Sequence, residues 1–441
     1  MKLLFLDHPQ HTHATWVLYE GLKRVLGWES LVVFPRKEVY HGRDHDLTET
    51  SWYREVYQDI ADGYELPRGV PPLSPGESLT TGDERTIVCN AGAWVFTTPD
   101  LQRPYDEAEV VDLLDAGHFD LVILGNSNRV PTVALARLRD RCVRPLPPVV
   151  YLDGGERDEH CAHWTHVFRP ALVFKQILTP EVEGQYRGDF VDLHVPLRLW
   201  PLPLACPFVN MESSDGADSP SSAQHRLRPE MAALPSLMNM PPGPRPVDVF
   251  SHFGPTWPAR ALLQERVAGA VRRLGVCGVL RGVVQHPNTG LPYYAVIACS
   301  RVGVSMRGSG RDTDRYWQIP PLGAALLADG TMGCVHPHPF RDGETAAFYR
   351  SLDEAERKLE WLLSDEEARC RIASAGREHL RRFHGVEARA LFFLAIVRQE
   401  IGVDVGDQQR EATAFWRRKL GWDSELPEWR GPVVGFFEEV T

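Results

Sequence analysis

The stretch Tyr293–Asp329, YYAVIACSRVGVSMRGSGRDTDRYWQIPPLGAALLAD, places a glycine-rich turn between a strand and a helix. Asp312-Thr313-Asp314 supplies a capping residue and early acids for that helix, and Gly323 ends it. After an opening helix, the pattern predicts a strand over 302–306, a turn over 307–311, a helix over 315–322 and a strand over 324–328. Such alternation is typical of a doubly wound sheet.

The turn has the features of an anion site. Its free backbone N–H groups and the positive end of the following helix dipole point at one spot, which suits a phosphate. The guanidinium groups of Arg307 and Arg311 can add charge-assisted bonds there. The predicted cradle consists of Gly308, Ser309, Gly310, Arg311, Asp312 and Thr313. A plain helix cap beside exposed arginines would explain the same residues, so both interpretations stay open.

The length, charge and cysteine content of the chain limit the classes of protein to which it can belong. The chain has 441 residues, enough for two or three domains, with 43% hydrophobic and 24% charged residues. Its net charge of −11 disfavours non-specific binding to nucleic acid or anionic lipid. Eight cysteines without a CxxC pair favour reduced thiols, and no apolar run has the length of a membrane span. We therefore expect a cytoplasmic protein with no metal site and no membrane span.

Two regions of strand–helix alternation flank a segment of different composition. Residues 1–205 open with strand, loop, helix and strand, and residues 247–404 restart the alternation. Residues 206–246 are rich in Ser, Asp, Pro, Met and Gly, and this composition is typical of a linker or mobile loop. The sequence therefore predicts the α/β class, with two Rossmann-like domains facing a central cleft.

Two segments carry a resemblance to a known family. They are SRVGVSMRGSGRDTDRYWQIPPLGAALLAD, from Ser300 to Asp329, and PFRDGETAAFYRSLDEAERKLEWLLSDEEARCRIASAGREHLRRFH, from Pro339 to His384. Together they resemble the C-terminal half of GT-B glycosyltransferases, and within those the CgeB/YkvP-like group. The resemblance covers roughly residues 250–390, whereas the N-terminal half is similar only in general layout.

The resemblance implies a nucleotide-sugar donor, UDP- or GDP-linked, on residues 247–404 and an acceptor on residues 1–205. It implies that the tail, residues 405–441, packs back on the first domain. No cofactor or metal is implied, because the cradle itself can stabilise the leaving diphosphate. The E-x7-E motif of the retaining branch falls on Gly310 and Gln318, so Gln318 is expected at the donor ribose. Glu344 is expected near the sugar or ribose, and the stereochemical outcome stays open.

Loops at the carboxyl ends of other strands supply further candidates. Gly254, in the loop 251–256, would face the phosphates from a second side, or belong to an ordinary turn. A hydroxyl acceptor needs a general base, which a His, Asp or Glu can provide. His13 after the first strand, and Asp153 with Glu156 after the strand 149–152, are the candidates. Each could equally be a capping, surface or acceptor-binding residue.

The leading hypothesis is a glycosyltransferase that moves a sugar from a nucleotide-sugar donor to a hydroxyl acceptor. The acceptor would be a glycan, a small molecule or a modified nucleobase in DNA. Two alternatives stay open: a GT-B-like nucleotide-sugar epimerase or hydrolase, and a nucleotide-binding protein without catalysis. The aromatic tail residues, such as Trp422 and Phe436, would also suit a homodimer contact.

Overall fold

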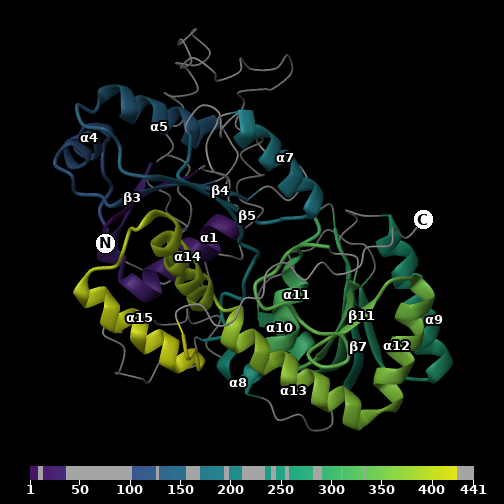
Figure 1. Ribbon diagram of the computed structural model, residues 1–441. Coiled ribbons are helices and arrows are strands. Elements are labelled where there is room, and N and C mark those ends of the chain that lie inside the picture. Colours follow the sequence, from purple (N-terminus) through teal and green to yellow (C-terminus); the bar gives the residue numbers. More distant parts are fainter. Residues whose placement is uncertain are drawn as a thin grey trace.

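The computed structural model describes most of the chain and forms two parallel sheets covered by helices (Figure 1). The described residues are 1–7, 13–35, 102–125, 129–154, 169–192, 198–210, 234–239, 245–253, 258–281, 291–308, 310–330 and 333–424. Glu156, Gly254 and Ser309, as well as residues 425–441, lie outside them. Among the described helices, none combines the length and the apolar character that crossing a membrane requires.

The first sheet has the strand order β2-β1-β3-β4-β5-β6, with every neighbouring pair parallel. Its strands are β1 (Leu3–Leu6), β2 (Leu31–Phe34), β3 (Leu121–Gly125), β4 (Val149–Asp153), β5 (Leu172–Lys175) and β6 (Leu199–Pro201). Its helices are α1 (His13–Leu26), α4 (Glu107–Asp115), α5 (Arg129–Arg141) and α7 (Pro180–Asp192). The strands are almost wholly apolar because helices bury both faces of the sheet.

The second sheet has the order β11-β10-β9-β7-β8 and is also parallel. Its strands are β7 (Val247–His252), β8 (Gly278–Arg281), β9 (Ser300–Ser305), β10 (Ala325–Asp329) and β11 (Ala347–Tyr349). The helices of this part are α8 (Leu234–Met238), α9 (Ala259–Leu274), α10 (Leu291–Ala298), α11 (Asp314–Gln318), α12 (Leu352–Ser364), α13 (Glu366–Phe383), α14 (Val386–Ile401) and α15 (Asp407–Leu420). The predicted α/β class with two Rossmann-like sheets is confirmed.

The helix predicted over 315–322 is wrong in its second half. α11 ends at Gln318, and a 3-10 turn over Pro320–Leu322 follows. Pro320 and Pro321 have no N–H to donate, so the α-helical ladder cannot continue through them. Gly323, with φ of 77°, then reverses the chain into β10. The short strands β5, β6 and β11 were not predicted, since three or four residues give too little pattern to identify.

The chain returns to the first sheet at its last two described helices. α14 and α15 pack on α1, and Figure 1 shows the yellow-green pair beside the purple helix. A buried ion network stabilises the contact between α1 and α14. Arg24 of α1 donates to Glu20 of the same helix and to Glu387 of α14, at 2.8 Å each. On the other side, the Trp416 indole donates to the Arg24 carbonyl at 3.2 Å.

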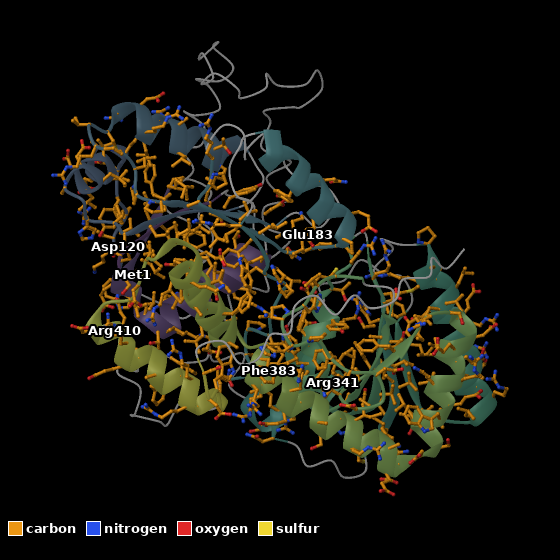
Figure 2. The ribbon with its side chains drawn as sticks, viewed as in Figure 1. Met1, Asp120, Glu183, Arg341, Phe383 and Arg410 are labelled. Atoms are coloured by element: carbon orange, nitrogen blue, oxygen red, sulfur yellow. The ribbon has the colours of Figure 1, made fainter. Side chains whose placement is uncertain are left out.

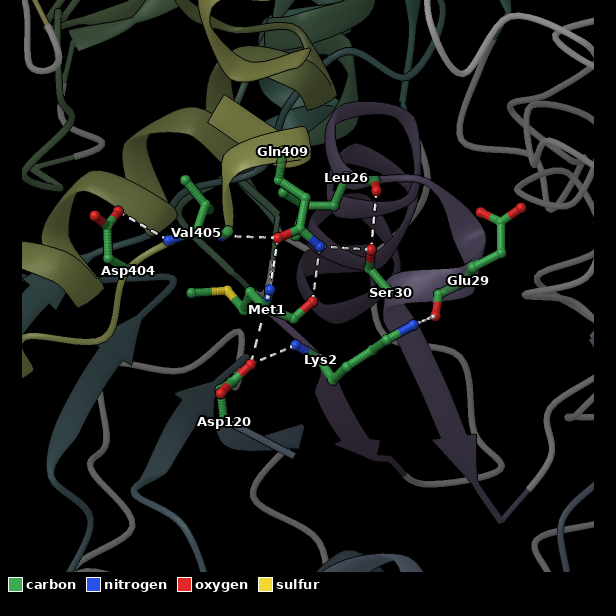
Figure 3. A network of polar contacts seen from close by, with 10 residues as sticks. Met1, Lys2, Leu26, Glu29, Ser30, Asp120, Asp404, Val405 and Gln409 are labelled. Atoms are coloured by element: carbon green, nitrogen blue, oxygen red, sulfur yellow. Dashed lines mark hydrogen bonds and ion pairs between the residues drawn. The ribbon is translucent and has the colours of Figure 1, made fainter. Parts of the chain in front are cut away.

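A second polar network joins α15 to the edge of the first sheet (Figure 3). The Gln409 amide donates to the Met1 carbonyl at 2.8 Å and to the Ser30 hydroxyl at 2.9 Å. Asp120, which precedes β3, accepts from the Lys2 N–H at 2.7 Å. The first strand, the end of α1 and the last helix therefore form one packed unit.

Gly21 permits the close contact between α1 and α14. A Cβ at this position would lie 2.1 Å from the Val386 carbonyl oxygen, so the helices would have to separate. We expect Gly21→Ala to lower the free energy of unfolding by about 1–3 kcal/mol, measured by urea denaturation. Gly269→Ala in α9 is the matched control, because nothing lies within 4 Å of its Cβ. That control should gain about 0.4–1 kcal/mol; a loss of similar size in both variants would contradict the packing argument.

Candidate functional site

The glycine-rich turn follows β9 at the carboxyl edge of the second sheet. It runs from Met306 to Thr313 and leads into α11. The Ser305 and Thr313 hydroxyls lie 3.2 Å apart and close its base, and the Tyr349 hydroxyl donates to the Ser305 carbonyl at 2.8 Å. Inside the turn, Gly308 N–H donates to the Gly310 carbonyl at 2.9 Å. These bonds join the described residues of the turn to one another and to the end of β11.

Two buried arginines lie behind the turn. Arg260 of α9 donates to the carbonyls of Arg307 at 2.8 Å and of Met306 at 3.0 Å. The guanidinium groups of Arg260 and Arg315 both lie over the Phe253 ring, at 5.9 and 5.5 Å from its centroid. Burial, reinforced by the charge of Arg315, lowers the pKa of Arg260 to about 9. Two like charges held together in the protein interior favour an anion beside them.

Neither arginine belongs to the cradle predicted from the sequence. Arg260 reads as one of several basic residues on α9, and Arg315 as a first-turn residue of α11. Their proximity depends on Phe253 at the end of β7, which both guanidinium groups contact. Only the fold brings the three residues together.

The side chains of Asp312 and Thr313 bond to the protein rather than extend from the turn. The Asp312 carboxylate accepts from the Leu204 N–H and from the Trp317 indole, both at 2.7 Å. Burial raises its pKa to about 7. Thr313 is the N-cap residue of α11, with its hydroxyl against Ser305. Any contribution of these two residues to a phosphate cradle therefore comes from their backbone.

The structure places Gln318 at the end of the helix that follows the turn, and Glu344 away from the turn. Gln318 ends α11, is buried, and accepts from the Tyr293 hydroxyl at 3.2 Å. Glu344 precedes the amino end of β11, pairs with Arg341 at 3.5 Å and is 64% exposed. Because β9, β10 and β11 are parallel, the amino end of β11 and the carboxyl end of β9 lie at opposite edges. Figure 2 labels Arg341, the ion-pair partner of Glu344.

The candidates on the first sheet also lie at its carboxyl edge. His13 is the first residue of α1, and its side chain is outside the described part of the structure. Asp153 ends β4, where it pairs with Lys175 of β5 at 3.0 Å and accepts from the Tyr186 hydroxyl at 2.6 Å. All three side chains are buried. Asp153 is thus part of an internal ion pair.

The carboxyl edges of the two sheets are in contact. Leu178, beyond the end of β5, accepts a hydrogen bond of 2.8 Å from the Val335 N–H, in the loop after β10. Leu204, beyond the end of β6, bonds to Asp312 in the glycine-rich turn. The turn therefore lies where the two sheets meet, which is the usual place for a ligand in open α/β sheets. Within the described residues, no group of three or more His, Cys, Asp or Glu side chains could hold a metal ion.

Two parallel sheets that meet at their carboxyl edges, with the last helices returned to the first sheet, define an α/β fold of the GT-B class. Residues 247–395, from β7 into α14, match the sequence model of a family described as glycosyl transferase-like. A search of curated proteins finds no match.

Solved structures give a weaker likeness. A glycosyltransferase from Rickettsia africae superposes with a TM-score of 0.49 and 8% identity, over 91% of this chain and 98% of that one. Anabaena Alr3699/HepE in complex with UDP gives a TM-score of 0.45 and 12% identity, over 90% and 100% of the two chains. The fold of this chain is defined by its own two sheets and the packing of its helices.

Proposed function

We propose that this protein is a glycosyltransferase that moves a sugar from a nucleotide-sugar donor to a hydroxyl acceptor. The main support for this proposal is that the candidate site lies within the segment that matches the glycosyl transferase-like family. The glycosyl transferase-like match covers residues 247–395, and the turn with its two buried arginines lies within it, at the meeting edge of the sheets. The family match favours sugar transfer over epimerisation, over hydrolysis and over binding without catalysis.

In the proposed mechanism the turn holds the diphosphate of the donor. Other backbone N–H groups of the turn and the side chains of Arg307 and Arg311 bind the phosphates, whereas the Gly308 N–H is already bonded to the Gly310 carbonyl. Buried Arg260 and Arg315 add positive potential behind the turn. As the glycosidic bond breaks, negative charge grows on the leaving nucleoside diphosphate. Preorganised donors stabilise that charge without requiring a metal ion. Gln318, through its side-chain amide, is proposed for the ribose.

The same proposal covers the type of donor, the group of enzymes, the compartment and the roles of individual segments and residues. The donor is UDP- or GDP-linked, and the chain belongs to the CgeB/YkvP-like group and acts in the cytoplasm. Residues 1–205 bind the acceptor, residues 206–246 link the domains, and residues 247–404 bind the donor. The general base is proposed among His13, Asp153 and Glu156, with Gly254 on the second side of the phosphates. Glu344, at the opposite edge of the sheet, is not included in the donor site.

A thermal-shift screen tests the donor site directly. Nucleoside diphosphates and nucleotide sugars with uracil and guanine bases would be added to the full chain. Binding to the folded state at a hundred times Kd stabilises a protein by about 2.7 kcal/mol, which gives a measurable rise in Tm. The absence of any shift with every nucleotide would rule out the proposed donor site.

Arg311→Ala is expected to weaken nucleotide binding about tenfold or more while leaving the protein folded. The variant removes one charge-assisted contact to phosphate, which is typically worth about 1.5–3 kcal/mol. Isothermal titration with the nucleotide selected in the screen measures the change. Arg341→Ala is the matched control, since Arg341 is 74% exposed and lies by the opposite edge of the sheet. Equal affinity in the two variants would place the phosphates away from Arg311.

A further inference from the structure

One buried carboxylate joins the glycine-rich turn to the segment that follows the first sheet. Both oxygens of Asp312 are engaged: Oδ1 accepts from the Trp317 indole and Oδ2 from the Leu204 N–H, each at 2.7 Å. Asp312 belongs to the turn, whereas Leu204 lies 108 positions earlier, just after β6. The conformation of the turn is therefore tied to the position of this segment.

The carbonyl of Leu204 is held by a residue of α14. Arg389 donates to the Leu204 carbonyl at 2.9 Å and to His384 Nδ1 at 3.0 Å, and its guanidinium lies over the Trp317 ring. Two residues further on, the Cys206 N–H donates to the His384 carbonyl at 2.8 Å. Leu204, through its N–H on one side and its carbonyl on the other, thus connects the turn to the point where the chain crosses back to the first sheet.

Resting on the function proposed above, we infer that Asp312 and Arg389 are positioning residues for the donor. The ionised Asp312 carboxylate accepts from the Leu204 N–H and so fixes the turn against Leu204. Arg389 donates to the Leu204 carbonyl and holds this residue in place. Neither side chain needs to touch the donor. Their contacts set the arrangement of the backbone N–H groups that the diphosphate meets.

Ionisation of Asp312 controls this contact. Both carboxylate oxygens face N–H donors, so a proton on either oxygen replaces an acceptor with a donor and breaks one hydrogen bond. Burial raises the pKa of Asp312 to about 7, and Arg389 and Asp314 act on it with opposite signs. Its proton therefore binds within the physiological range of pH.

The neighbouring groups keep one charge state over that range. Burial lowers the pKa of His336 to about 3 and that of His384 well below its usual value, so both rings are neutral. Burial also raises the pKa of Tyr316 well above its usual value, and Arg389, with a pKa lowered to about 10 by burial, stays charged. Among these groups, Asp312 is the one that titrates near neutrality.

The test is the affinity for UDP-glucose and, in parallel, GDP-mannose, measured by isothermal titration between about pH 6 and pH 8.5. The diphosphate of a nucleotide sugar does not titrate in this range, so its own ionisation adds nothing. The loss of one hydrogen bond, about 1 kcal/mol, corresponds to a loss of affinity of about fivefold as pH falls through about 7. Asp312→Asn presents an amide N–H₂ to one of the two donors, and should bind weakly with a flat profile.

Two further variants separate positioning from general loss of structure. Arg389→Lys retains the charge and one donor, and should recover most of the affinity that Arg389→Met loses. Glu387→Gln changes another buried acid of the same crossing, one that bonds to Asn210 and Arg24 and not to the turn. It should keep the pH profile of the unchanged protein even if Tm falls.

The outcomes are distinct. If the unchanged protein binds neither nucleotide sugar, the proposed function fails and this inference fails with it. If it binds one with an affinity that is flat across pH, or if Asp312→Asn keeps the same pH dependence, the inference alone fails. A fall in affinity below about pH 7 that is absent in Asp312→Asn supports it.

Discussion

Arg24→Met is expected to lower the free energy of unfolding by about 3–5 kcal/mol, because it leaves buried Glu387 without its ion-pair partner and leaves Glu20 with Lys23, at 3.3 Å. Arg24, Glu20 and Glu387 are all buried. Burial alone would lower the pKa of Arg24, but the carboxylates of Glu20 and Glu387 hold it above its usual value. Urea denaturation followed by circular dichroism measures the loss.

The control for Arg24 is Arg103→Met. Arg103 contacts Glu109 at the same 2.8 Å, but this pair is on the surface, with the Arg103 side chain 61% exposed. Water and salt screen such a pair, so its removal should change stability far less. Equal losses in the two variants would show that burial adds nothing to the Arg24 network, contrary to the expectation.

The Arg24 network also bears on the arrangement of the domains. Glu387 accepts from Asn210 at 2.9 Å, so the network reaches from α1 through α14 to the segment after β6. Cys206 and Leu204 of that segment are bonded to His384 and Arg389. The crossing of the chain between the sheets is thus built from buried, hydrogen-bonded polar groups. Such groups fix one geometry more strictly than apolar packing, which tolerates small shifts.

Local features of the fold could be predicted from the sequence. The ends of the helices α14 (Val386–Ile401) and α15 (Asp407–Leu420) are examples. Each ends at a glycine in the left-handed region, Gly402 and Gly421, and this ending is encoded within a few residues. The position of the glycine-rich turn after a strand was likewise predictable, since strand, turn and capping residues are adjacent in the chain.

Contacts between distant residues could not be predicted in this way. Leu204 and Asp312 are 108 positions apart, and Arg24 and Glu387 are 363 apart. No periodicity or motif connects such pairs, because their contact depends on how the two sheets are placed. Asp312 was therefore expected in the phosphate cradle on the basis of its position in the turn, whereas its carboxylate faces the Leu204 peptide.

The second large effect concerns the buried pair at the carboxyl edge of the first sheet. Lys175→Met is expected to destabilise the protein by about 3–5 kcal/mol near pH 8, because Asp153 then remains buried without the ammonium group that neutralises it. Urea denaturation near pH 8 measures the loss.

The double variant Lys175→Met with Asp153→Asn decides what Asp153 does. Removing both charges leaves no uncompensated ion, so much of the stability lost by Lys175→Met alone should return, with the Tyr186 hydroxyl still close to the new amide. If sugar transfer also survives in the double variant, the pair is structural and the general base is elsewhere, with His13 and Glu156 as the remaining candidates. If the stable double variant binds nucleotide normally but transfers no sugar, Asp153 acts on the acceptor. The ion pair with Lys175 then holds that carboxylate in position at the edge where the two sheets meet.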